Sequence, residues 1–175
     1  MRVSRRELTE AKDMHIRDCQ QADLPALIDL TIEAFRPLFE VDLPDLLDPV
    51  VFAHDHGGWK DDYRREVPSL FAPDANRFIT LAEDAEGSGL PLGYVGWQVS
   101  LDGSGRLKMV AVHPKARRQN VGSALCQAAL ARLKERGVSV VHIGTGGDAF
   151  HAPARRLYES LGFTGYPVMD YTGAI

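Results

Sequence analysis

Three consecutive strand-like runs joined by short glycine-rich turns are the feature that most limits the folds open to this chain. The runs cover residues 77–82, 93–99 and 107–112, and the turns lie at 87–89 and 102–105. β-Branched and aromatic residues between such turns are typical of an antiparallel meander, because short turns join only neighbouring antiparallel strands. The sequence therefore predicts three adjacent strands of one sheet.

The segments before and after this meander supply helices and further strands. Their helical runs carry apolar residues three or four positions apart, and their strand runs are rich in β-branched residues. Before the meander we expect a strand at 14–17, a helix at 23–35 ended by Pro37, a loop at 37–58 with one helical turn at 43–47, and a helix at 59–70. After it we expect a helix from Val121 to Gly137, a strand at 138–143 buried on both faces, a helix at 154–161 and a last strand at 163–171. This order predicts an α/β (α+β) fold with a mixed, mostly antiparallel central sheet flanked by helices.

Length and charge place the chain in a broad class. Its 175 residues fit a single domain, which we assign to residues 14–175. Residues 1–13 are assigned to an N-terminal extension, for which a flexible conformation is one expectation. The net charge of −4 argues against a nucleic-acid partner, because phosphate binding needs a basic surface. No run reaches the roughly 18 apolar residues of a membrane span, and no secretory signal is recognisable. We therefore expect a cytoplasmic protein with no membrane partner.

The cysteines and histidines do not form a recognisable disulfide or metal pattern. Cys19 and Cys126 lack motif spacing, which suits a reducing compartment, and Cys126 has the setting of a buried thiol. His54 and His56 flank Asp55 in a polar segment, without further ligands at a recognisable spacing. The sequence predicts no metal site.

The most informative stretch joins the third meander strand to the next helix. After residues 110–112 comes a short loop, the helix begins near Val121, and Gly122 allows a ligand to approach the backbone closely. The first N–H groups of a helix lack partners and its dipole is positive there, so such a start binds anions. A diphosphate would suit this stretch, although a solvated basic turn is an equally good interpretation of composition alone. The loop contributes the basic side chains of Lys115, Arg117 and Arg118.

One motif in this stretch resembles a known family. Arg117-x-x-Asn120-x-Gly122 is similar to motif A of the GNAT N-acetyltransferase superfamily, Arg/Gln-x-x-Gly-x-Gly/Ala. Asn120 stands where the family usually has glycine. Asparagine is the residue other than glycine that best tolerates a positive φ, so we expect the turn to keep its shape.

A second motif lies further along the chain. His151-x-x-Ala154-x-x-x-Tyr158-x-x-x-Gly162-Phe163 resembles motif B of the same superfamily, Asn-x-x-Ala-x-x-x-Tyr-x-x-x-Gly-Phe. His151 replaces the family's asparagine, and the other four positions match. The two motifs in this order after a meander make the resemblance specific. It extends over residues 14–171 and is strongest from residue 107 onward.

The resemblance implies a GNAT-like fold and an acyl-CoA-dependent N-acyltransferase. Such an enzyme transfers acetyl from the co-substrate acetyl-CoA to an amine by direct attack in a ternary complex. The strand at 110–112 would hold the pantetheine arm, the amides of 118–123 would hold the pyrophosphate, and Tyr158 would act as general acid toward the departing thiolate. The residues that the resemblance assigns to acetyl-CoA are Val110, Ala111, Val112, Arg117, Arg118, Gln119, Asn120, Val121, Gly122, Ser123, His151 and Arg155.

The general base is harder to assign from the sequence. Asp148 follows the strand that would border the acyl site, and it is our first candidate for a base or an amine-binding carboxylate. Glu33 is the second candidate and a chain of water molecules the third. A turn residue is the simpler interpretation of Asp148, and a packing role is the simpler one for Tyr158.

The acceptor is expected to be a small-molecule or peptide amine, bound mainly by residues 35–71. The alternative function is a non-catalytic acyl-CoA-binding sensor or regulatory domain, since the base is unassigned and the motifs depart at Asn120 and His151. A last strand with an open edge would also allow a homodimer.

Overall fold

The structure, a computed structural model, describes residues 14–85 and 89–174. Its centre is a five-stranded sheet in the order β1-β2-β3-β4-β5, antiparallel except for the parallel β4–β5 pair. The mixed, mostly antiparallel sheet and its central meander are therefore confirmed. The extension expected at 1–13 and most of the turn at 87–89 lie outside the described residues. The strands are β1 (Met14–Asp18), β2 (Arg77–Asp84), β3 (Pro91–Val99), β4 (Gly105–Val112) and β5 (Val141–Ile143).

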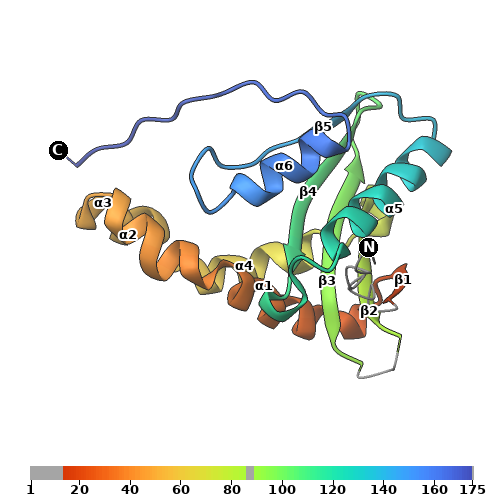
Figure 1. Cartoon of the computed structure of the whole chain (residues 1–175), viewed down its shortest axis with the longest axis horizontal. Coiled ribbons are helices and arrows are strands. Elements are labelled where there is room, and N and C mark those ends of the chain that lie inside the picture. Colours follow the sequence, from red (N-terminus) through yellow and green to blue (C-terminus); the bar gives the residue numbers. More distant parts are fainter. Residues whose placement is uncertain (1–13, 86–88, 175) are drawn as a thin grey trace, which may run out of the picture.

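Helices cover both faces of the sheet (Figure 1). α1 (Leu24–Pro37) and α4 (Trp59–Ser69) pack on one face, whereas α5 (Val121–Glu135) and α6 (Ala152–Ser160) pack on the other. None of the helices in the described residues is long and apolar enough to cross a membrane. The shorter helices are η1 (Gln21–Asp23), the π-helix η2 (Leu38–Asp42), α2 (Leu43–Leu46), α3 (Pro49–His56), η3 (Pro73–Ala75) and η4 (Pro114–Ala116).

The strands alternate their side chains between two separate cores. Tyr94 of β3 is fully buried in the core beneath α1, and its neighbour Val95 is fully buried in the core beneath α5. The buried Tyr94 hydroxyl is hydrogen-bonded to Thr31 Oγ1 at 2.7 Å, and Met109 Sδ lies 2.9 Å away. This satisfied polar contact ties α1 to β3 and β4 inside an otherwise apolar layer.

A β-bulge in β4 changes which core its side chains enter. Gly96 pairs with Met109 and Trp97 pairs with Leu107, so Lys108 is the extra residue. Residues two positions apart in a regular strand share a face, but Leu107 packs beneath α5 and Met109 beneath α1. The bulge therefore turns Met109 toward the α1 layer.

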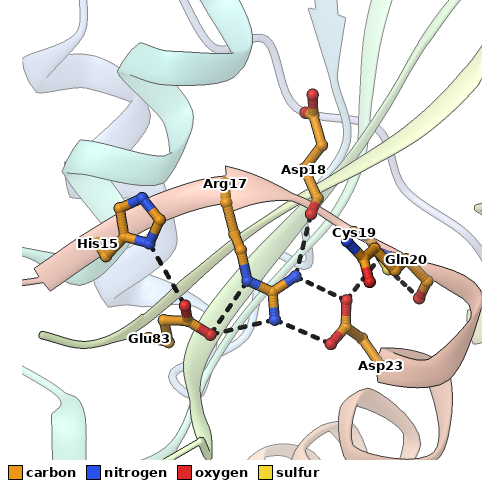
Figure 2. Close-up of polar contacts among 7 residues, drawn as sticks. All are labelled: His15, Arg17, Asp18, Cys19, Gln20, Asp23 and Glu83. Atoms are coloured by element: carbon orange, nitrogen blue, oxygen red, sulfur yellow. Dashed lines mark hydrogen bonds and ion pairs between the residues drawn. The ribbon is translucent and has the colours of Figure 1, made fainter. Parts of the chain in front are cut away.

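The first strand is held by a network of charges around Arg17 (Figure 2). The Arg17 guanidinium donates to Asp23 at 2.8 and 2.9 Å and to Glu83 at 3.1 Å. Asp23 also accepts a hydrogen bond from the Gln20 N–H at 2.7 Å. The hydrogen bonds from Arg17 lower the pKa of both carboxyl groups. Arg17 thus links β1 to β2 and to the turn that starts α1.

The structure corrects the expected loop at 37–58, which is largely helical. α1 runs through Pro37 and continues into the π-helix η2, where Leu43 N–H donates to Leu38 O. Pro44 and Pro49 occupy first-turn positions of α2 and α3, where a missing N–H costs no hydrogen bond. The prolines therefore start helices here, and Figure 1 shows α2 and α3 extending beyond the sheet.

The structure also corrects the two strands expected after α5. β5 is shorter than 138–143 and pairs with β4 alone among the described residues, so Val141 and Ile143 are only partly buried and His142 is exposed. No strand forms at 163–171. The chain leaves α6 through Gly162, with φ of 89°, and continues as an extended segment (Figure 1). This segment carries several exposed apolar side chains. The most exposed of these are Tyr166, Val168, Met169 and Tyr171.

Candidate active site

The loop before α5 has the backbone shape of an anion-binding site. Arg118 and Asn120 have φ values of 61° and 63°, both in the left-handed region, and Asn120 is the N-cap of α5. The positive φ expected at Asn120 is therefore confirmed. Alternation between left-handed and other conformations gathers successive N–H groups into a concave nest, here directly before the positive end of a 15-residue helix.

The side chains of this loop mostly brace the loop itself. Arg117 donates to the Ala34 carbonyl at 2.7 Å and so anchors the loop to α1. Gln119 donates to the Lys115 carbonyl at 2.9 Å. Arg117 and Gln119 therefore shape the nest, and the backbone N–H groups at the start of α5 are donors toward an anion.

β4 and β5 separate along the strand that leads to this loop. Their parallel ladder covers only Gly105 to Leu107 on β4 and ends at the pair Leu107–Ile143. From Met109 to Val112, β4 pairs with β3 on one edge and has no strand partner on its other edge among the described residues. This free edge leads from the split to the N-terminus of α5.

A cavity of about 230 Å³ lies at the split and takes its lining from both layers of helices. The α1 and α4 layer contributes aromatic and acidic side chains, β4 and the loop after β5 contribute backbone, and α6 contributes the residues of motif B. The lining residues are Phe35, Tyr63, Glu66, Leu107, Lys108, Met109, Val110, Gly144, Thr145, His151, Ala154 and Tyr158.

Tyr158 projects from α6 into this cavity and is mostly buried. It lies beside the core of α5, and burial raises the pKa of its phenol above the usual value. The hydroxyl therefore stays protonated at neutral pH, as a proton donor must.

Asp148 and His151 form a tight pair at the start of α6. His151 Nδ1 lies 2.7 Å from Asp148 Oδ2, and the His151 N–H donates to Asp148 Oδ1 at 3.0 Å. Burial acts to raise the pKa of the Asp148 carboxyl, but the hydrogen bonds from His151 outweigh it and lower the pKa overall. His151 lines the cavity, whereas Asp148 is behind it.

The side chain of Arg155, which the resemblance assigned to acetyl-CoA, contacts the loop after β5 in this structure. Its Nη1 donates to the carbonyls of Gly146 and Asp148 at 2.6 and 2.7 Å. The guanidinium thus fixes the loop that carries Asp148, and it is engaged within the protein.

The structure does not bring Glu33, the second candidate for the base, together with Tyr158, because the two residues line different cavities. Glu33 is half exposed, forms an ion pair with Arg36 at 3.1 Å and lines a separate cavity of about 580 Å³. That cavity lies between α1, the start of β3 and the η4 turn. The helical phase of α1 turns Phe35, and not Glu33, toward the cavity of about 230 Å³ at the split.

Sequence reasoning assigned residues 35–71 to the acceptor as a region, but it singled out neither of the two α4 side chains that line the cavity. Tyr63 and Glu66 lie three residues apart on one face of this helix, with the Tyr63 ring 5.3 Å from that of Phe35. Burial, with the nearby acidic charge of Glu66 and Asp62, raises the pKa of the Tyr63 phenol. The available signal was an aromatic residue followed by a carboxylate at helical spacing. The local sequence, however, gives no indication that α4 and α6 line the same cavity.

The comparisons with known proteins follow this geometry. The model of the acetyltransferase (GNAT) family matches residues 29–163, which contain the meander, the nest and the cavity. The chain belongs to the GNAT acetyltransferase family. It shares its fold with solved GNAT structures, including a putative acetyltransferase from Desulfovibrio desulfuricans with a TM-score of 0.65, 19% identity and coverage of 90% of this chain and 88% of that one.

Further relatives carry more specific names. A GNAT acetyltransferase from Brucella melitensis, solved in complex with acetyl-CoA, has a TM-score of 0.61 and 23% identity, covering 89% of this chain and 85% of that one. The mycothiol acetyltransferase of Acidothermus cellulolyticus is 35% identical over 151 residues, which is 77% of this chain and 45% of that protein. The counterpart from Stackebrandtia nassauensis is 31% identical, over 86% of this chain and 49% of that protein. This GNAT chain thus spans half or less of the length of the curated relatives it matches.

Proposed function

We propose that this GNAT domain is an acetyl-CoA-dependent N-acetyltransferase that works by direct attack in a ternary complex. The observation that carries the proposal is the split between β4 and β5, with a nest of N–H groups at one end and a cavity containing Tyr158 at the other. Acetyl-CoA is an elongated molecule whose anionic diphosphate suits the nest and whose distant thioester suits the cavity. The acetyl-CoA complex of the Brucella melitensis relative supports the same assignment.

The residues available to acetyl-CoA fit its chemistry. The N–H groups of 118–123 suit the pyrophosphate, since they open onto the N-terminus of α5. The free edge of β4 at 110–112 offers backbone donors and acceptors to the amide groups of pantetheine. A backbone N–H aimed at the thioester oxygen would stabilise the tetrahedral intermediate, a contribution often worth about 3–4 kcal/mol.

The reaction moves two protons. The amine nitrogen bonds to the thioester carbonyl carbon, the C–S bond breaks, and the sulfur takes a proton as the amine loses one. Tyr158 is the donor to sulfur in this proposal, because its phenol remains protonated inside the cavity.

The acceptor enters from the side of α1 and α4. Phe35 and Tyr63 offer an apolar wall, and Glu66 offers a negative charge to a cationic amine. A small-molecule amine suits this opening better than a nucleic acid or a lipid. Amines of the mycothiol series belong in the first test panel, because the curated relatives are named for mycothiol.

We further infer a cytoplasmic location from the two buried free cysteines, which suit a reducing compartment. A homodimer stays a prediction.

Thiol release from acetyl-CoA across a panel of small amines and peptides tests the proposed activity. We expect release that depends on one class of amine and yields an acetylated product by mass spectrometry. Binding of acetyl-CoA, measured by thermal stabilisation, without turnover on any amine would instead support the acyl-CoA sensor.

A further inference from the structure

One proton of the reaction lacks an assigned acceptor. Tyr158 supplies the proton that goes to sulfur, but another group must take the proton that the amine loses. The question rests on the proposed N-acetyltransferase function. Among the described residues that line the cavity, His151 and Glu66 offer an imidazole and a carboxylate, the side-chain types that most often accept protons in catalysis.

The pair formed by Asp148 and His151 fixes the state of the imidazole. The lowered pKa of Asp148 keeps its carboxylate ionised at neutral pH, and an ionised carboxylate only accepts hydrogen bonds. The proton between Oδ2 and Nδ1, 2.7 Å apart, therefore belongs to Nδ1. In the neutral ring Nε2 then carries the lone pair, so the ring nitrogen that does not face Asp148 is a base.

The surroundings hold the pair rigidly. A Cβ at Gly146 would overlap both Asp148 Oδ2 and His151 Nδ1, so only glycine lets the backbone lie against the pair. Arg155 fixes the same loop through two carbonyls. The His151 ring also contacts two aromatic rings, Phe150 at 5.0 Å between ring centres and Phe35 at 6.4 Å.

We propose that His151 is the general base of the transfer and that Asp148 is its positioning residue. Nε2 takes the proton from the amine nitrogen as that nitrogen bonds to the carbonyl carbon, and the imidazolium forms beside the Asp148 carboxylate. The C–S bonding pair leaves with sulfur, which receives the Tyr158 proton. The imidazolium then loses its proton to solvent and the tyrosinate regains one, so the enzyme returns to its starting state.

The other charged and titratable groups around His151 have different places in this scheme. Glu66 and Tyr63 of α4 are across the cavity, and Lys108 of β4 borders it. In our account Glu66 attracts the cationic form of the acceptor, which loses one proton to solvent before it attacks as the free amine; Glu66 does not accept the proton released in the attack. Arg155 is engaged behind the ring, and Tyr158 serves the leaving group.

The test compares pH profiles of kcat and kcat/KM for wild type, His151→Gln, Asp148→Asn and Glu66→Gln, using the best amine of the panel. We expect kcat to fall about 100- to 1000-fold in His151→Gln, with loss of the acidic limb of the kcat profile. Asp148→Asn should lower kcat about 10- to 100-fold and move the acidic limb of the kcat profile to a different pH. Acetyl-CoA affinity, measured by calorimetry, should change less than about threefold in both.

A matched control is built into the chain. His54 Nδ1 lies 2.7 Å from Asp55 Oδ1, the same separation, but this pair is on the surface of α3 with the His54 side chain 86% exposed. His54→Gln should leave both profiles unchanged. Nitrogen-15 spectra of labelled histidine give a readout independent of turnover, in which the neutral His151 ring should show the Nδ1–H tautomer in wild type and lose it in Asp148→Asn.

The outcomes separate the two proposals. No turnover by wild type on any amine would remove the acetyltransferase function and this inference with it. Turnover by wild type with the acidic limb kept in His151→Gln and lost in Glu66→Gln would overturn the role of His151 alone. A His151→Gln variant with normal kcat and weakened acetyl-CoA binding would also overturn it, since His151 would then be a coenzyme ligand.

Discussion

Leu107 pairs with Ile143 as the last residues of the β4–β5 ladder, and the two strands separate beyond them. The next residue, Lys108, is the bulged residue of β4, so the bulge and the split occur at the same place. The cavity that contains Tyr158 opens there and is lined from both faces of the sheet. In the proposed function, this split is the place where the acyl group and the amine meet.

Replacing Tyr158 by phenylalanine removes the proton donor and keeps the ring. We expect kcat to fall about 100-fold, because positioned acid catalysis is typically worth a factor of 10² or more. Calorimetry should find the acetyl-CoA affinity within about twofold of wild type. A variant with wild-type kcat across the pH range would exclude Tyr158 from the chemistry.

The conformation of Asn120 predicts opposite effects for two substitutions. Asn120→Gly keeps the positive φ without strain, so stability and acetyl-CoA affinity should stay close to wild type. Asn120→Val forces a β-branched residue into the left-handed region, which costs about 1–2 kcal/mol. Chemical denaturation and calorimetry measure both quantities, and equal affinities for the two variants would contradict a nest held open by residue 120.

Gly146 has no room for a side chain. Gly146→Ala places a methyl group against Asp148 and His151, so the pair must move. We expect kcat to fall about tenfold or more, since a base displaced by about 1 Å loses its alignment. Gly147 is the neighbouring control, because a Cβ there meets nothing within 4 Å. Similar kinetics for Gly146→Ala and Gly147→Ala would argue against a rigid pair.

The Arg17 network makes stability fall in acid. Asp23 and Glu83 have pKa values below their ordinary 3.8 and 4.5, because both accept hydrogen bonds from Arg17 in the folded state. Their contribution is complete above about pH 5 and is lost as the pH falls through the lowered values, since the unfolded chain then binds more protons.

Arg17→Met should therefore lower the free energy of unfolding by about 1 kcal/mol at pH 7 and flatten its pH dependence below pH 5. Urea denaturation at several pH values measures both effects. An unchanged acid slope in Arg17→Met would assign the pH dependence to other groups.

The two thiols should be inert in the native protein. Cys19 and Cys126 are buried, and burial raises the pKa of each thiol to about 12. We expect native protein to react with a thiol reagent far more slowly than protein unfolded in guanidinium. Rapid labelling of two thiols per folded chain would contradict this packing.

The sequence predicted the parts of the structure that local chemistry determines. The glycine turns define the meander, and Asn120 was assigned its left-handed conformation because few other residues accept it. Residues 37–58 were misjudged because Pro44 and Pro49 start helices as readily as they end them.

The parts that failed depend on distant partners. β5 is short because pairing with β4 alone supports it, and no pattern within 138–143 reveals that. Glu66 was missed because α4 and α6 are separated by the whole meander along the chain. The pairing of Asp148 with His151 was within reach, since an aspartate side chain often hydrogen-bonds a backbone N–H a few residues away. The role proposed for His151 required knowledge of the cavity.

The central claim is that one molecule of acetyl-CoA binds between the start of α5 and the cavity at the split. Calorimetric titration of acetyl-CoA into the protein tests this claim most directly. We predict a single site with one acetyl-CoA per chain, displaced by free CoA and weakened in Asn120→Val. Absence of binding heat, with no thermal stabilisation at millimolar acetyl-CoA, would contradict it.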